Sequence, residues 1–176
     1  MSRTAIGVYI ITLCSAFGAI QAAEVVAPAS PTGDAPFGGL RLRGINVREV
    51  KEMADADYAK IAGWGCNSIR LQIHADTDVP QRKALGLVTS EFPLKLSEKA
   101  FDEIKRNLDL AHKHNLAVVI SMQNSPGKHS GKLWQDFRYR DVLISLWKEL
   151  ARRYGSHPAV VGYDLLNEPN AARGGR

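Results

Sequence analysis

Apolar and polar positions along the chain repeat with two periods, one typical of strands and the other of amphipathic helices. Four short apolar stretches predict strands: Leu40–Val47, Ser68–Ile73, Ala117–Met122 and Val160–Leu166. Between them, apolar residues at helical spacing predict three helices, the first capped by Asp55 and running to about Ala62, the second capped by Ser97 and the third ended by Gly155. Strands that alternate with helices in this way are joined by right-handed crossovers, so we expect a parallel α/β sheet.

The second predicted strand has one polar face, formed by Ser68, Arg70, Gln72 and His74. A sheet covered by helices on both sides is apolar on both faces, whereas a closed barrel holds polar groups inside, near its active end. The alternative is an open sheet in which the polar residues lie on an edge strand. With alternate residues counted on each strand, the barrel brings together seven polar side chains: Arg70, Gln72, His74, Ser121, Gln123, Asp164 and Glu168.

The fourth predicted strand ends in the tripeptide Asn167-Glu168-Pro169. Proline favours an extended backbone at the residue before it, so we expect the strand to continue to Glu168 and to place its carboxyl group at the mouth of the barrel. Partial burial at such a position raises the pKa of a carboxyl group, as a general acid requires near neutral pH. The alternative for the bare tripeptide is an ordinary turn from strand to loop.

Four stretches of the chain resemble glycoside hydrolase family 5, the cellulase-type family of retaining enzymes built on a (β/α)8 barrel. They are Leu42–Val47, Ile61–Ile73, Val118–Gly127 and, most specifically, Leu146–Pro169. The resemblance implies a parallel (β/α) barrel of TIM type, of which the chain contains about four of the eight βα units. It also implies an enzyme that hydrolyses O-glycosyl bonds in a β-linked glucan, mannan or related polysaccharide and needs no cofactor.

The resemblance assigns a role to each of three residues. Glu168 matches the general acid/base, Asn167 the residue that holds the sugar 2-hydroxyl, and Arg70 the arginine that bonds the carboxylate of the nucleophile. An alternative for Arg70 is a structural pair with Asp164, and the two roles are compatible.

Two positions depart from the family pattern, because Ser121 and Gln123 stand where members often have an Asp and a substrate-contacting His. We expect Gln123 to contact substrate, with His74 or His129 as a spatial substitute for the missing His; the alternative for both histidines is a plain loop residue. Trp134, next to a glycine-rich loop, is the tryptophan best placed to stack on a sugar.

A larger departure concerns the nucleophile, which in the family is a glutamate at the end of the seventh strand. A retaining mechanism needs two carboxyl groups about 5–5.5 Å apart. We therefore expect residues 38–176 to form the N-terminal half of a barrel that lacks the nucleophile and is inactive alone. Its open strand edges should make the chain marginally stable or cause it to self-associate. Two alternatives remain: a non-catalytic carbohydrate-binding or structural remnant, and another barrel enzyme that uses Glu168 for different acid/base chemistry.

Composition and charge narrow the range of partners. The 176 residues are 45% hydrophobic and 23% charged, as in globular proteins. The 23 Lys and Arg against 18 Asp and Glu give a net charge of +5 without a dense basic run, so we expect no nucleic-acid partner. The sequence contains no known metal, dinucleotide or nucleotide motif, so we expect no metal either.

The first residues have the pattern of a targeting segment. Arg3 precedes the apolar stretch Ile6–Leu13 and several small residues, which predicts a secretory signal peptide over residues 1–23, with an N-terminal membrane anchor as the alternative. Residues 24–37 contain three prolines and indicate a linker. We therefore expect a secreted or periplasmic protein without a stable membrane partner, in which Cys66 is the one remaining thiol and lies in the core.

Overall fold

The computed structural model describes residues 42–48, 52–76, 86–88, 92–93, 95–127 and 130–169. Its elements follow one another along the chain in this order: β1 (Gly44–Val47), α1 (Asp55–Gly63), β2 (Ser68–Asp76), β3 (Gly86–Val88), α2 (Glu98–Lys113), β4 (Ala117–Asn124), α3 (Ser130–Gln135), α4 (Phe137–Tyr154) and β5 (Val160–Asp164). The predicted signal peptide, the predicted linker and His129 lie outside the described residues.

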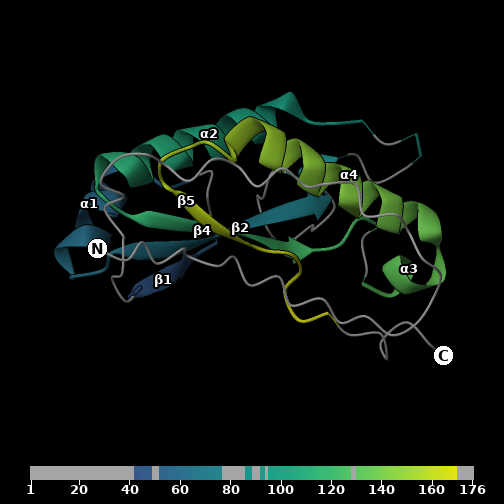
Figure 1. Ribbon diagram of the computed structural model, residues 1–176, viewed down its shortest axis with the longest axis horizontal. Coiled ribbons are helices and arrows are strands. Elements are labelled where there is room, and N and C mark those ends of the chain that lie inside the picture. The colour runs from purple at the N-terminus through teal and green to yellow at the C-terminus, as the bar shows by residue number, and fades with distance from the viewer. Residues whose placement is uncertain are drawn as a thin grey trace, which may run out of the picture.

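The strands form one sheet in the order β1-β2-β4-β5, in which all neighbours are parallel, and β3 pairs with the far end of β2. This confirms the predicted parallel α/β arrangement. Helices α2 and α4 lie along the same side of the sheet (Figure 1). Strand pairing aligns Asn46 with Arg70, and it aligns Gln72 with Ser121 and Ser121 with Asp164. The carboxyl ends of the four strands therefore meet at one edge.

The core joins the apolar face of the sheet to the helices. β2 and β4 contribute six side chains that are at most 3% exposed: Ile69, Leu71, Ile73, Val118, Ile120 and Met122. The predicted stripe of α2 packs against them, and the Ser97 hydroxyl caps this helix by accepting a hydrogen bond from the Ala100 N–H at 3.3 Å. Because strand residues alternate in direction, the polar residues of β2 and β4 point to the opposite side of the sheet.

The helices differ from the prediction at two points. Asp57, and not Asp55, closes the first turn of α1 by accepting a hydrogen bond from the Ala54 N–H at 2.8 Å. The third predicted helix is α4, which Asp136 caps by accepting a hydrogen bond from the Arg138 N–H at 3.0 Å, and the short helix α3 before it was not predicted. Cys66 is half-buried against the core.

The strands also differ from the prediction at their carboxyl ends. β2 and β4 continue to Asp76 and Asn124, whereas β5 ends at Asp164 and not at Leu166. The short strand β3 was not among the predicted strands. Within the ranges given above, none of the helices is both long enough and apolar enough to cross a membrane.

Candidate active site

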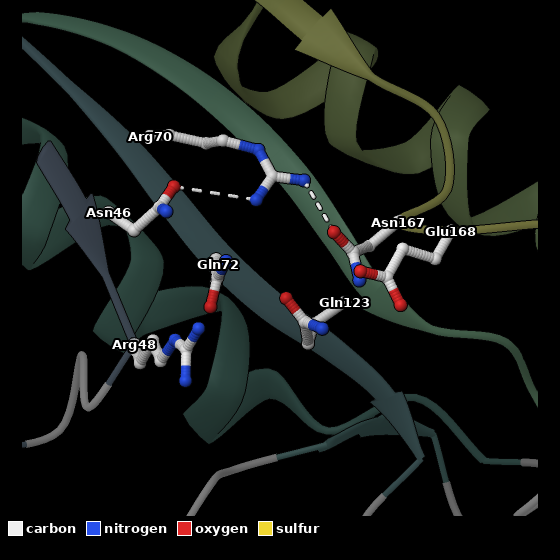
Figure 2. A pocket seen from close by; sticks show the side chains of 7 residues that line it. All are labelled: Asn46, Arg48, Arg70, Gln72, Gln123, Asn167 and Glu168. Atoms are coloured by element: carbon white, nitrogen blue, oxygen red, sulfur yellow. Dashed lines mark hydrogen bonds between the residues drawn. The ribbon is translucent and has the colours of Figure 1, made fainter.

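A polar cavity of about 340 Å³ opens where the strands end. Its walls come from β1, β2, β4 and the segment after β5, and Figure 2 shows the seven side chains that line it: Asn46, Arg48, Arg70, Gln72, Gln123, Asn167 and Glu168. Every lining residue carries an amide, a guanidinium or a carboxyl group. In parallel (β/α) barrels the active site lies at this end of the strands.

Arg70 is held in place by Asp164. One carboxylate oxygen of Asp164 accepts hydrogen bonds from Arg70 Nε at 2.9 Å and from Arg70 Nη2 at 2.5 Å, and from the Ser121 hydroxyl at 2.9 Å. The ion pair is partly open to water, since the two side chains are 29% and 34% exposed. The structural pair that we weighed as an alternative role for Arg70 is therefore present.

The same guanidinium also reaches Asn167. Arg70 Nη2 donates to Asn167 Oδ1 at 3.0 Å (Figure 2). The Asn167 backbone N–H donates to the carbonyl oxygen of Met122 at 2.8 Å. A guanidinium can only donate, so the amide oxygen of Asn167 must face Arg70. The amide nitrogen then points away from Arg70, with two N–H groups available to a ligand.

Glu168 lines the cavity, but its backbone conformation differs from the prediction. The expected extended backbone is wrong: Glu168 has a φ of 46°, and β5 ends four residues earlier, at Asp164. The hydrogen bond from the Asn167 N–H to the Met122 carbonyl oxygen attaches Asn167 to β4. Glu168 is the next residue, and it has the left-handed conformation. The Glu168 side chain is exposed and lines the cavity beside Asn167. A left-handed residue with a long side chain is strained, and such strain is found most often at functional sites.

Four of the six residues predicted for the site come together, and two do not. Arg70, Gln123, Asn167 and Glu168 share the cavity. His74 is buried and does not line it; the pairing of β2 with β4 shifts after Ile73, and His74 lies opposite Asn124. Trp134 lies on α3, where the Arg140 guanidinium is 5.8 Å from its ring centroid.

Three other lining residues, Asn46, Arg48 and Gln72, were not among those predicted for the site. Gln72 was expected on the inner face by strand alternation, without a role of its own. Asn46, near the end of β1, accepts a hydrogen bond from Arg70 Nη1 at 3.4 Å. Arg48 was missed, because it follows the end of β1 and only the tertiary structure brings it to the cavity. In the part of the chain that the structure describes, no three His, Cys, Asp or Glu side chains are grouped to hold a metal ion.

The chain is similar in sequence to known proteins. The sequence model of the family described as "Cellulase (glycosyl hydrolase family 5)" matches residues 31–175. A beta-xylosidase of Phanerodontia chrysosporium is 30% identical over 129 residues, which are 65% of this chain and 25% of that protein. Cellodextrinase A of Ruminococcus flavefaciens is 26% identical over 118 residues, 64% of this chain and 32% of that protein. The chain thus spans about a quarter to a third of the length of these relatives.

Solved structures show the same fold. The endoglucanase Cel5A of Pseudomonas stutzeri superposes with a TM-score of 0.55 at 23% identity, over 77% of this chain and 44% of that one. An endocellulase of Pyrococcus horikoshii gives a TM-score of 0.54 at 21% identity, over 74% of this chain and 38% of that one. The predicted fold class, a partial parallel (β/α) barrel of TIM type, is confirmed.

Proposed function

The chain belongs to glycoside hydrolase family 5, the cellulase family, and on this premise we propose that its cavity is the acid/base side of a retaining site for a neutral β-linked polysaccharide. The observation that carries the proposal is the convergence of Arg70, Asn167 and Glu168 on one cavity at the strand ends. These three residues come from segments almost one hundred positions apart, and each has the chemistry that the reaction needs.

Glu168 is the proton donor and acceptor in this proposal. In the first step its carboxyl group protonates the glycosidic oxygen as the bond from that oxygen to the sugar carbon breaks, and in the second it takes a proton from the attacking water. Its exposed position leaves room for a polysaccharide chain to reach the carboxyl group. The carboxyl group lies beside Asn167 in the cavity.

Asn167 and Arg70 orient the sugar. With its oxygen bonded to Arg70, the Asn167 amide offers N–H donors to the oxygen of the 2-hydroxyl next to the reacting carbon. Hydrogen bonds to this hydroxyl strengthen in the transition state of glycoside hydrolysis. Arg70 is itself fixed by Asp164, so the amide is held before any ligand arrives.

The nucleophile must be a second carboxylate, about 5–5.5 Å from the first. Among the described residues that line the cavity, Glu168 carries the one carboxyl group, and the Asp164 oxygen that faces Arg70 already accepts three hydrogen bonds. We therefore assign the nucleophile to a segment outside the described residues. We expect the 176-residue chain by itself to show no turnover of an aryl β-cellobioside.

The substrate class follows from the relatives and from the cavity. The similar proteins include an endoglucanase, a cellodextrinase and a beta-xylosidase, and all three names denote enzymes for sugars without a charged group. We propose a β-linked glucan or a related neutral polysaccharide as substrate and export of the protein as its route to that substrate. Gln123, at a position where the resemblance implies His, favours a second candidate, a site that binds sugar without hydrolysing it.

An affinity label tests the role of Glu168 without requiring turnover. N-bromoacetyl-β-cellobiosylamine carries an alkyl bromide where the leaving group of a substrate would be. A carboxylate oxygen near that position attacks the bromomethyl carbon, so that an ester bond forms and bromide leaves. We expect peptide mapping by mass spectrometry to find one ester, at Glu168, formed at a saturable rate and prevented by cellotetraose.

Two variants control the experiment. Glu168→Gln should abolish the label, whereas Asp102→Asn, which removes an exposed carboxyl group on α2, should leave it unchanged. Labelling that is spread over many exposed carboxyl groups, without saturation or protection, would refute the proposal. Tight binding of cellotetraose without any label at Glu168 would support the site that only binds sugar.

A further inference from the structure

Two buried oxygen atoms in the cavity wall lack hydrogen-bond donors. Gln72 of β2 and Gln123 of β4 both point into the cavity (Figure 2). Within the described part of the chain, the Oε1 atom of each is buried and has no hydrogen-bond partner. Gln72 as a whole is only 2% exposed. A folded protein rarely leaves a buried carbonyl oxygen without a donor, and such an atom needs an explanation.

The charges around the cavity limit what can supply the missing donors. Arg48 and Arg70 bring two guanidinium groups to the wall, and these disfavour a cation at the two oxygens. The oxygens themselves are acceptors, so they disfavour an anion. A neutral group that donates hydrogen bonds remains, and a sugar hydroxyl is such a group, since it donates one hydrogen bond and accepts two.

We propose that Gln72 and Gln123 form an acceptor pair, whose Oε1 atoms accept hydrogen bonds from hydroxyl groups of a sugar. It is the same sugar that Asn167 and Glu168 contact. This inference rests on the proposed function and narrows its substrate to an unmodified neutral sugar. Asn167 offers donors on one side of the cavity, and the glutamine pair offers acceptors in the floor. The ligand must therefore accept on one side and donate on the other. Some sugars lack the hydroxyl group that faces the two glutamines, or carry a substituent on it. Such a sugar cannot donate the hydrogen bond there and should bind less tightly.

Calorimetric titration of the full 176-residue chain with cellotetraose tests the pair. Gln72→Met and Gln123→Met keep the length of each side chain and remove its hydrogen-bonding atoms. Each should weaken binding by about threefold to tenfold, the usual value of one hydrogen bond expressed as a ratio of Kd. Gln135→Met, on α3 and outside the cavity, is the matched control and should bind like the parent chain.

A thermal midpoint separates recognition from a structural role. Because each Oε1 has no donor in the folded chain, its replacement by Met should leave the midpoint unchanged or raise it. A midpoint that falls by several degrees in either variant would overturn the inference. It would show that the glutamine makes a hydrogen bond that stabilises the free protein and does not serve binding.

A series of monodeoxy cellobiosides gives a second measurement that does not depend on the stability of the variants. One deoxy sugar should bind the parent chain more weakly than cellobiose does, yet bind the Met variant of the matching glutamine as well as cellobiose does. If no deoxy sugar shows this coupling, or if both Met variants bind cellotetraose within twofold of the parent, the acceptor pair is refuted and the proposed function stands. If the parent chain binds no cellotetraose and Glu168 takes no label, the proposed function itself fails.

Discussion

Asp164→Ala removes the anchor of the site, and its effect can be worked out from the contacts of one oxygen atom. That oxygen accepts two hydrogen bonds from Arg70 and one from Ser121. Ser121 is fully buried, so its hydroxyl loses its acceptor without gaining water, which costs about 1–2 kcal/mol. The Arg70 and Asp164 side chains are about one-third exposed, so water screens their pair and its loss adds only about 1 kcal/mol. We expect the free energy of unfolding to fall by about 2–3 kcal/mol.

Urea denaturation at pH 7, followed by circular dichroism, measures this change. Lys105→Ala is the matched control, because its pair with Asp109 lies on the surface with side chains 60% and 51% exposed, and it should cost less than about 0.5 kcal/mol. A double-mutant cycle of Asp164→Ala with Ser121→Ala should give a coupling of about 1 kcal/mol. A loss for Asp164→Ala as small as that of the control would show that Asp164 does not organise Arg70, and the description of the site would be wrong.

Three further predictions follow from the described residues. Glu168→Asn should abolish the label and raise the thermal midpoint, because Asn tolerates the left-handed conformation and relieves about 0.5–1 kcal/mol of strain. A lower midpoint, or an equal rise in Glu168→Gln, would contradict this prediction. Hydrogen bonds from Arg152 and Arg153 lower the pKa of Glu149 from 4.5 to about 2, so its contribution to stability is present above pH 4.5 and is lost as the pH falls towards 2; urea denaturation between these pH values should show a smaller loss for Glu149→Gln. The 176-residue chain should self-associate, because β5 pairs with β4 alone among the described strands and exposes Val161 and Tyr163, with Leu165 exposed just after it; sedimentation equilibrium should show assembly that Val161→Lys weakens, and a monomer at every concentration would refute it.

The elements that the sequence predicted well are those that local pattern decides. The stripe of α2 and its Ser97 cap depend on residues within one helix, and both are confirmed. The sequence did not predict that Asp57, and not Asp55, closes the first turn of α1, because either carboxylate suits a helix start. Asp55 instead accepts a hydrogen bond from Lys113, which lies 58 residues away in the sequence. β3 has only three residues and exists because it pairs with β2, which no local pattern reveals.

The candidate site divides in the same way. Strand alternation was enough to bring Arg70 and Gln123 to one cavity, because β2 and β4 run in register up to Ile73. It failed for His74, which is buried and does not line the cavity, because alternation predicts the face of a residue and not its tertiary surroundings. The left-handed backbone of Glu168 opposes the local preference before a proline, so only the contacts around it determine it.

A crystal structure of the 176-residue chain with bound cellotetraose tests the central claim most directly. The quantity to measure is the distance from the Glu168 carboxyl oxygens to the nearest glycosidic oxygen. The account predicts a hydrogen-bond distance, with the Asn167 amide nitrogen on the 2-hydroxyl of the adjoining sugar and the two glutamine oxygens on its other hydroxyls. A sugar bound on another surface, or one whose glycosidic oxygens all lie out of reach of Glu168, would contradict it.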